Sequence, residues 1–219
     1  VDNDKDTIIT NHDKAKASSN TVTIEAKDKD DKVEVKLDNV NIDTSKQNKA
    51  AVSVTGKGDT TIELDGDNEL KSGNNHAGLE HNKTDTSGNL TIQDNDKNGS
   101  LKAAGGQFGA GIGGAGAAND AQVKITGGKI TATGGEYGAG IGGGFKGSGD
   151  VTITGGEINA NGGNYGAGIG GGDYSSGKVT ISGGEINATG GYLGAGIGGG
   201  EKGSGDVTIT GGEITSATG

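Results

Sequence analysis

The chain has 219 residues, of which 49 are glycine, and it contains no proline, cysteine, methionine, tryptophan or arginine. So much glycine without a Gly-X-Y period excludes collagen, and a net charge of −10 at pH 7 argues against nucleic acid as a partner. Only 28% of the residues are hydrophobic, a composition that by itself favours disorder, so a fold is expected only if those residues recur at fixed positions.

Residues 1–30 contain two short strand-like pieces, Ile8-Ile9 and Val22-Thr23-Ile24. We predict that they form an irregular N-terminal cap or first coil, because the open end of a stacked β structure needs covering. The sequence begins at Val1 without a charged-then-apolar leader, which we interpret as a mature or trimmed fragment. No apolar run approaches the roughly 20 residues of a membrane span, so we expect no membrane insertion.

From residue 31 onward, apolar and polar residues alternate over short segments. The apolar members of the first segments are Val33, Val35 and Leu37, then Val52 and Val54, then Ile62 and Leu64. A period of two is typical of strands, whereas a helix would need apolar spacings of three and four. We therefore predict degenerate coils of strands up to about residue 100.

A strict repeat follows. The string Gly-Ala-Gly-Ile-Gly-Gly begins at Gly109, Gly138, Gly166 and Gly194, at spacings of 29, 28 and 28 residues. One short strand cannot bury its apolar face alone, but equivalent strands of successive coils can pair their backbones and share a core. For residues 31–219 we therefore predict an all-β, right-handed parallel β-helix with about 28 residues and three short strands per coil.

The alternation also assigns residues to the inside of this solenoid. They are Val151, Ile153, Ile158, Ala160, Ala167 and Ile169, with their equivalents in the other repeats. We expect Ile125, Ile153, Ile181 and Ile209 to form one buried ladder, with neighbours about 4.8 Å apart. The last repeat stops where another Gly-Ala-Gly-Ile strand would follow, so we expect the native chain to extend beyond Gly219.

Two early stretches carry a family resemblance. DKVEVKLDNVNI (31–42) and TTIELDGDNEL (60–70) resemble the bacterial extracellular carbohydrate-binding β-helix family, whose members are pectate-lyase-like solenoids without lyase activity. Some members bind plant polysaccharides with calcium. The glycine-rich repeats are similar to tandem repeats of Gram-positive cell-wall-anchored surface proteins. The resemblance covers most of residues 31–219 and implies architecture and location, but it carries over no binding residue.

The sharpest local motif lies at residues 94–100, DNDKNGS. Asp94, Asp96 and Asn98 follow the D-x-D-x-N-G spacing of an oxygen-ligand calcium loop. The glutamate that would close such a loop is replaced by Gly105. We predict a calcium site at these three residues, with a plain polar turn as the alternative, because Asp, Asn and Gly all favour turns. Weaker versions of the motif occur at residues 2–6 and 65–69.

The strand of each regular repeat that contains Gly-Ala-Gly-Ile is preceded by a large apolar residue, namely Phe108, Tyr137, Tyr165 and Leu193. Alternation places these residues inward or at a corner as a stack, with a platform for sugar rings as the alternative. Phe145 and Tyr174 fall instead in loops after the glycine run. We expect these two side chains to be exposed and predict that they bind ligand.

Three further surfaces follow from the repeat. Stacked carboxylates at Glu157, Glu185 and Glu213 are expected to be solvated, or else bridged by cations. Outward threonines such as Thr152 and Thr180 suit an exposed strand face, with ice binding as a less favoured alternative. The outer face of the Gly-Ala-Gly-Ile strand carries almost no side chains and could accept a flat sugar chain or a second solenoid.

These features argue against an enzyme. The chain has no cysteine or arginine nucleophile or base, and its three histidines, His12, His76 and His81, lie outside the regular repeats. We expect a non-catalytic adhesin or carbohydrate-binding module at an extracellular or bacterial cell-surface location, with a polysaccharide or a host or plant glycan as partner. The alternative is a structural stalk, which should be uniform on all sides, whereas a binding face should concentrate its deviations on one side. The oligomeric state stays open.

Overall fold

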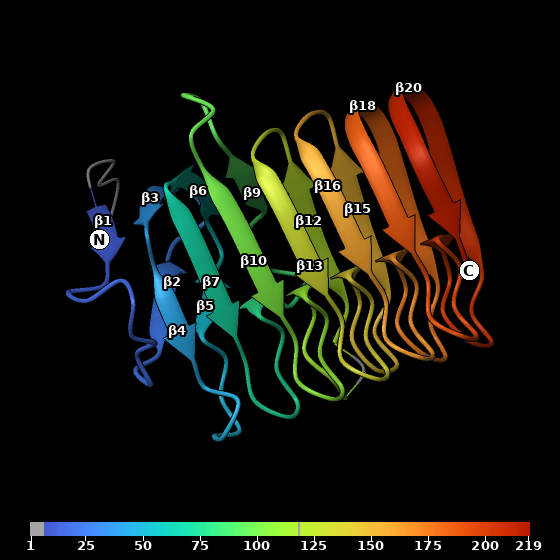
Figure 1. Cartoon of the computed structure of the whole chain (residues 1–219), viewed down its shortest axis with the longest axis horizontal. Coiled ribbons are helices and arrows are strands. Elements are labelled where there is room, and N and C mark those ends of the chain that lie inside the picture. The colour runs from blue at the N-terminus through green and yellow to red at the C-terminus, as the bar shows by residue number, and fades with distance from the viewer. Residues whose placement is uncertain (1–6, 118) are drawn as a thin grey trace.

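The computed structural model describes residues 7–117 and 119–219. Its strands wind into about eight coils of about 28 residues each (Figure 1). The chain rises along the far side of the stack and descends along the near side as it advances from its N-terminal to its C-terminal end, which is right-handed winding. The predicted all-β parallel solenoid is confirmed. The weak acidic motif at residues 2–6 lies outside the described residues.

Equivalent strands stack in three parallel rows. The first row contains β1 (Thr7–Thr10), β3 (Lys32–Asp38), β6 (Asp59–Asp65), β9 (Leu90–Gln93), β12 (Ala121–Ile125), β15 (Gly149–Ile153) and the first parts of β18 (Gly177–Thr189) and β20 (Gly205–Thr218). The second row contains β4 (Asn41–Asp43), β7 (Asp67–Lys71), β10 (Ser100–Ala104), β13 (Lys129–Thr133), β16 (Glu157–Asn161) and the second parts of β18 and β20.

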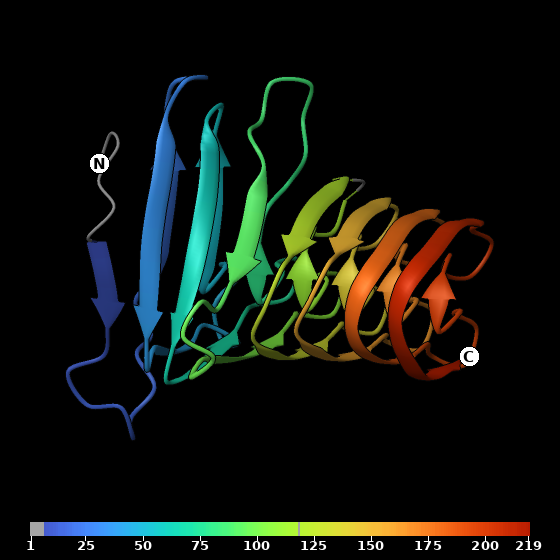
Figure 2. The ribbon, with the colours of Figure 1, turned by 90° about the horizontal axis from the view of Figure 1, so that it is seen from above.

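The third row forms a separate sheet. It contains β2 (Val22–Ala26), β5 (Val52–Gly56), β8 (Leu79–Glu80), β11 (Ile112–Gly113), β14 (Ile141–Gly142), β17 (Ile169–Gly170) and β19 (Ile197–Gly198). The early coils reach further to one side than the regular ones (Figure 2), because β3 and β6 have seven residues each whereas β12 and β15 have five. No helix among the described residues could span a membrane.

The pairing register follows the sequence repeat. Ile125, Ile153 and Ile181 stack on one another and are fully buried. The degenerate coils align with the regular ones, since Leu79 pairs with Ile112 and Ile92 with Ile125. At the N-terminal end, β1 pairs with β3 and β2 with β5, so residues before 30 already continue the rows.

One burial prediction is wrong. Ile209 pairs with Ile181 as expected, but its side chain is 46% exposed. It belongs to the last coil of the described chain, on which no further coil is stacked, so only one side of it is covered. The fourth position of the ladder therefore has the predicted register without the predicted burial.

Glycines in the Gly-Ala-Gly-Ile-Gly-Gly segments allow the backbones of neighbouring coils to approach closely. A Cβ on Gly140 would lie 2.6 Å from the Gly168 carbonyl oxygen and 2.7 Å from the Asn161 nitrogen. Gly142 has a φ of +132°, and a Cβ there would lie 2.0 Å from the Gly170 carbonyl oxygen. Neighbouring backbone therefore occupies the space that side chains leave free. The hypothesis that this bare face accepts a sugar chain or a second solenoid is wrong at these positions.

The buried ladder predicts a contrast between two adjacent residues of β15. Ile153→Asp should place an unpaired charge between Ile125 and Ile181 and lower the free energy of unfolding by several kcal/mol. Thr152→Ser, one residue away and partly exposed, should change it by less than about 1 kcal/mol. Denaturant unfolding of both variants measures the difference, and equal stabilities would contradict the register.

Candidate functional site

The aromatic residues gather along one corner of the solenoid. The chain has six, Phe108, Tyr137, Phe145, Tyr165, Tyr174 and Tyr192, and the first five form a continuous set of ring contacts. The sixth, Tyr192, is 88% exposed and directly precedes Leu193, which follows Tyr165 in the next coil. We call this set the aromatic corner.

The centre of the corner is a stack of three rings. Phe108 and Tyr137 have ring centroids 5.1 Å apart at an interplanar angle of 9°, and Tyr137 and Tyr165 have the same spacing at 7°. This spacing follows from the coil repeat, because equivalent residues of parallel coils lie about 4.8 Å apart. All three side chains are half-buried, so the stack lies at a corner and not inside the core.

Phe145 and Tyr174, the two predicted ligand-binding residues, join this stack from the next turn. The Phe145 ring lies 5.6 Å from Phe108 and 5.5 Å from Tyr137, and the Tyr174 ring lies 6.5 Å from Phe145. The backbone sets the approach, since the Phe145 amide donates a hydrogen bond to the Phe108 carbonyl oxygen at 2.8 Å. Tyr174 is 51% exposed, as predicted, whereas Phe145 is half-buried because the stack covers one side of it.

Charged groups surround the rings. Lys146 Nζ lies 5.1 Å from the Phe145 ring centroid, and Lys202 Nζ lies 4.4 Å from the Tyr174 centroid and 2.7 Å from its hydroxyl oxygen. Hydrogen bonds to Tyr174 and then to Glu201 raise the pKa of Lys202. The exposed amines and ring faces can together contact a ligand that has both polar and apolar sides.

Asp173 is a residue of this corner that the sequence reasoning missed. It follows Phe145 by 28 residues and so occupies the same position one coil later. Its side chain is 3% exposed, and Oδ1 has no hydrogen-bond partner among the described residues. Burial and then the charge of Glu201 raise its pKa. The only available signal was the replacement of an aromatic residue by an acid within the repeat.

A polar groove of about 400 Å³ lies along the same turns. Its lining includes the serines at equivalent positions, Ser148, Ser176 and Ser204. Asp150, Lys178 and Asp206 pair in register, so the charges alternate in sign along the groove. Lys83 reaches over from an earlier coil, with its Nζ 3.0 Å from Asp150 Oδ2. The groove offers hydroxyl, amine and carboxylate groups beside the aromatic corner.

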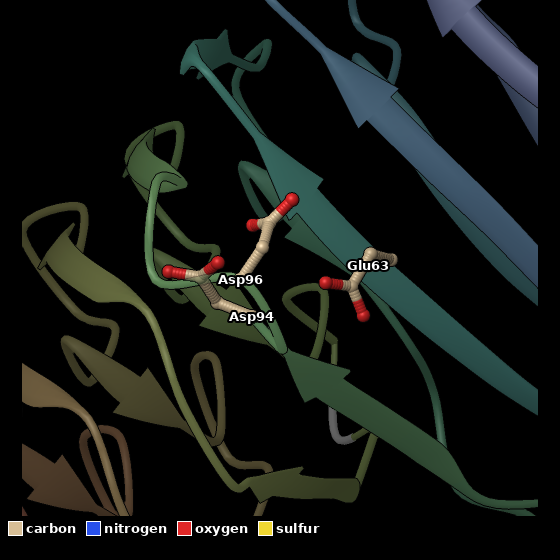
Figure 3. A group of neighbouring side chains, drawn as sticks. All are labelled: Glu63, Asp94 and Asp96. Carbon is tan, nitrogen blue, oxygen red and sulfur yellow. The ribbon is translucent and has the colours of Figure 1, made fainter.

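The predicted calcium loop joins β9 to β10 and contains a third carboxylate that the motif did not include. Oxygens of Glu63, Asp94 and Asp96 lie within 4.8 Å of one another, and Glu63 comes from β6 of the preceding coil (Figure 3). Ca²⁺ binds oxygen at 2.3–2.6 Å, so two of its ligands lie at most about 5 Å apart. The hard oxygen donors and their spacing therefore fit this cation.

The same carboxylates also hold the loop together. Asp94 accepts hydrogen bonds from the backbone amides of Asn98 at 3.2 Å and Gly99 at 3.1 Å. Glu63 accepts from the Asn95 amide at 2.7 Å and from the Gln93 side chain at 2.9 Å. Glu63 Oε2 also accepts from the Asn95 side chain at 2.9 Å. Glu63 Oε1 and the two Asp94 oxygens accept one of these hydrogen bonds each, so each of them has a second lone pair for a cation. Asn98 thus contributes its backbone to the loop, and the polar turn that was the alternative interpretation is also present.

The weaker motif at residues 65–69 does not converge. Asp65 Oδ2 lies 3.3 Å from Lys36 Nζ, and Asp67 accepts a hydrogen bond from the Ser100 hydroxyl at 2.7 Å. Glu69 lies 3.9 Å from the amine of Lys102. Each carboxylate has its own partner, so this stretch forms two ion pairs and one hydrogen bond and no common site.

Comparison with known proteins supports the fold. A family model described as a beta helix repeat matches residues 123–145, 151–173 and 179–201. The three segments begin at Val123, Val151 and Val179, which are equivalent positions of successive coils. Searches of curated proteins and of solved structures gave no match. The matched segments cover less than half of the chain, and together with the stacked coils they support a parallel β-solenoid fold.

The buried carboxyl of Asp173 predicts a pH-dependent effect of Asp173→Asn. Because the pKa is raised in the folded state, the unfolded chain releases this proton more readily, and the carboxyl lowers stability as pH rises through its folded pKa. The variant should therefore be more stable than the wild type at pH 7, and the gain should vanish below the ordinary pKa of 3.8. Denaturant unfolding at both pH values tests this. Destabilisation at both would show that the carboxylate has a favourable partner.

Proposed function

We propose that this protein is a non-catalytic, extracellular or cell-surface glycan-binding solenoid whose ligand lies on the aromatic corner. The observation that carries the proposal is the gathering of all six aromatic residues along one corner, where Tyr174 and Tyr192 are exposed. A structural stalk would have similar sides all round, whereas here the aromatic residues are concentrated along one corner. This asymmetry favours a binding module over a spacer.

The chemistry of the corner suits a sugar. A pyranose ring has an apolar C–H face and a hydroxyl rim, and aromatic side chains offer rigid apolar area for the first while nearby polar groups bind the second. Lys146 and Lys202 can donate hydrogen bonds to hydroxyls, and the serine row of the adjoining groove can donate and accept. Binding groups of both kinds therefore lie within one strip of surface.

The absence of catalysis is part of the same proposal. His81 is buried, its Nδ1 lies 2.8 Å from the Gln122 carbonyl oxygen, and burial lowers its pKa. His76 Nδ1 lies 2.7 Å from Glu80 Oε2. Both histidines are thus engaged in structural contacts, and neither belongs to the aromatic corner. A ligand bound there would meet side chains that hold it without a paired nucleophile and base.

A glycan array with the wild type and Tyr165→Leu tests the proposal. Leucine already occupies this row at position 193, so the variant should fold while losing one ring of the stack. We expect the wild type to bind at least one glycan and Tyr165→Leu to bind it about tenfold more weakly, the loss of about one aromatic contact. Thr152→Ser serves as the control and should bind normally. A wild type that binds nothing would contradict the proposal.

Calcium binding at Glu63, Asp94 and Asp96 is a second, separate element of the proposed function. The turns between the first and second strand rows lie along the top of the stack, and the loops that carry the aromatic corner lie along the bottom (Figure 1). A cation in the β9–β10 loop would therefore stabilise that loop, or bridge an anionic polysaccharide there. It would not assist a sugar on the aromatic corner.

The calcium site predicts a specific thermal shift. Extracellular sites can be as weak as roughly millimolar, and for such a site about 5 mM CaCl₂ would stabilise the protein by RT ln(1 + [L]/Kd), about 1 kcal/mol, so it should raise the melting temperature. Asp96→Asn removes an exposed ligand while leaving the hydrogen bonds of Asp94 in place, and it should abolish the shift. An unchanged melting temperature of the wild type, or an equal rise in both proteins, would rule out this site.

A further inference from the structure

Each regular coil turns through positive φ at three equivalent positions. Two of the resulting rows consist of glycine in every coil: Gly113, Gly142, Gly170 and Gly198, and Gly128, Gly156, Gly184 and Gly212. The remaining set of equivalent positions, which we call the left-handed row, contains no glycine. It consists of Ala117, Lys146, Tyr174 and Lys202, with φ values of 69°, 60°, 58° and 56°. In a chain with 49 glycines, this row has kept its side chains.

The left-handed conformation is unfavourable for these residues. A Cβ crowds the following carbonyl oxygen there, and only glycine, and to a lesser degree Asn or Asp, adopts it without appreciable strain. Burial does not compensate, because Tyr174 is 51% exposed and the Lys202 side chain is 58% exposed. The turn of the stacked coils imposes this conformation, but it does not require a side chain there, and strained non-glycine residues of this kind are concentrated at functional sites.

The left-handed row forms the outer edge of the aromatic corner. Its members from successive coils lie side by side, so Lys146 and Lys202 flank Tyr174 at one coil interval on either side, and the two lysines are roughly 10 Å apart along the solenoid axis. Lys146 lies against Phe145, and Lys202 against Tyr174. The Lys202 amine lies over the Tyr174 ring and donates to its hydroxyl, so the row presents the Lys146 amine and, beside it along the axis, a paired Tyr174 ring and Lys202 amine.

We infer that Lys146, Tyr174 and Lys202 occupy these left-handed positions in place of glycine because their side chains contact a neutral glycan chain that runs along the solenoid axis. The inference rests on the proposed function and deepens it by assigning the contact residues, the direction and the ligand class. The length of the row exceeds a single sugar ring, so the ligand is an oligosaccharide or polysaccharide. The exposed part of the Tyr174 ring packs against the apolar side of one unit, and the amines of Lys146 and Lys202 donate their remaining protons to ligand hydroxyls.

The charges of the protein favour an uncharged glycan as the ligand. The protein carries a net charge of −10, which repels an acidic polysaccharide at long range. Within the corner, the two lysines are offset by Glu136, Asp173 and Glu201, and Lys202 Nζ lies 3.4 Å from Glu201 Oε1. The lysines equally disfavour a cationic ligand. A neutral chain with many hydroxyls is compatible with both signs of charge.

The test replaces the row by glycine, in Lys146→Gly/Tyr174→Gly/Lys202→Gly. Glycine relieves the strain at positive φ, and this gain is at least as large as the loss from the greater freedom of the unfolded chain. We therefore expect a melting temperature no lower than that of the wild type. Binding to neutral oligosaccharides of an array should fall at least tenfold. Lys97→Gly is the matched control, because Lys97 is also exposed at a φ of 60° but lies in the β9–β10 loop. Its melting temperature should also be retained, and its glycan binding should be unchanged.

The outcomes separate this inference from the proposed function. A wild type that binds no glycan overturns both. Glycan binding that Tyr165→Leu weakens but the triple glycine variant retains overturns the inference alone. A clear fall in the melting temperature of the triple variant, with none in Lys97→Gly, would also overturn it, because the side chains would then serve the fold. Tight binding of a monosaccharide, or a preference for polygalacturonate over neutral chains, would overturn the assigned ligand class.

Discussion

The structure depends on parallel backbone hydrogen bonding between equivalent positions of successive coils. The narrow core works with few apolar residues because each one lies between two copies of itself, as Ile153 lies between Ile125 and Ile181. Close stacking in turn requires glycine wherever one backbone approaches another, most clearly at Gly142, where neither the φ nor the available space would admit a side chain. The high glycine content of the chain is thus a consequence of the close stacking of its coils.

This stacking converts every repeated residue into a row on the surface. Tyr137 and Tyr165 become a ring stack, and Glu157 and Glu185 become neighbouring carboxylates, purely because they are 28 residues apart. A departure from the repeat consequently changes the surface at one place only. Asp173 is such a departure, since it occupies the position of Phe145 in the next coil and adds a buried carboxyl to an aromatic corner.

The solenoid also keeps its two candidate sites apart. Turns between the first and second strand rows carry the acidic loop, while the loops at the opposite edge carry the aromatic residues (Figure 1). The family resemblance implies calcium and glycan acting together, but here a cation at Glu63, Asp94 and Asp96 cannot reach a ligand on Tyr174. Each feature therefore has to be explained by its own contacts.

The sequence by itself determined the coil length, the strand register and the inside positions, because in a solenoid these depend only on period and alternation. Tertiary structure decided which non-equivalent residues meet. Phe145 contacts Phe108 and Glu63 contacts the Asp94 loop across different turns, and no periodicity encodes such neighbours. Ile209 has the sequence of a core residue but is exposed, because burial requires a coil on both sides. The left-handed row was likewise hidden, since backbone conformation at a non-glycine residue is set by the turn that the stacked coils impose.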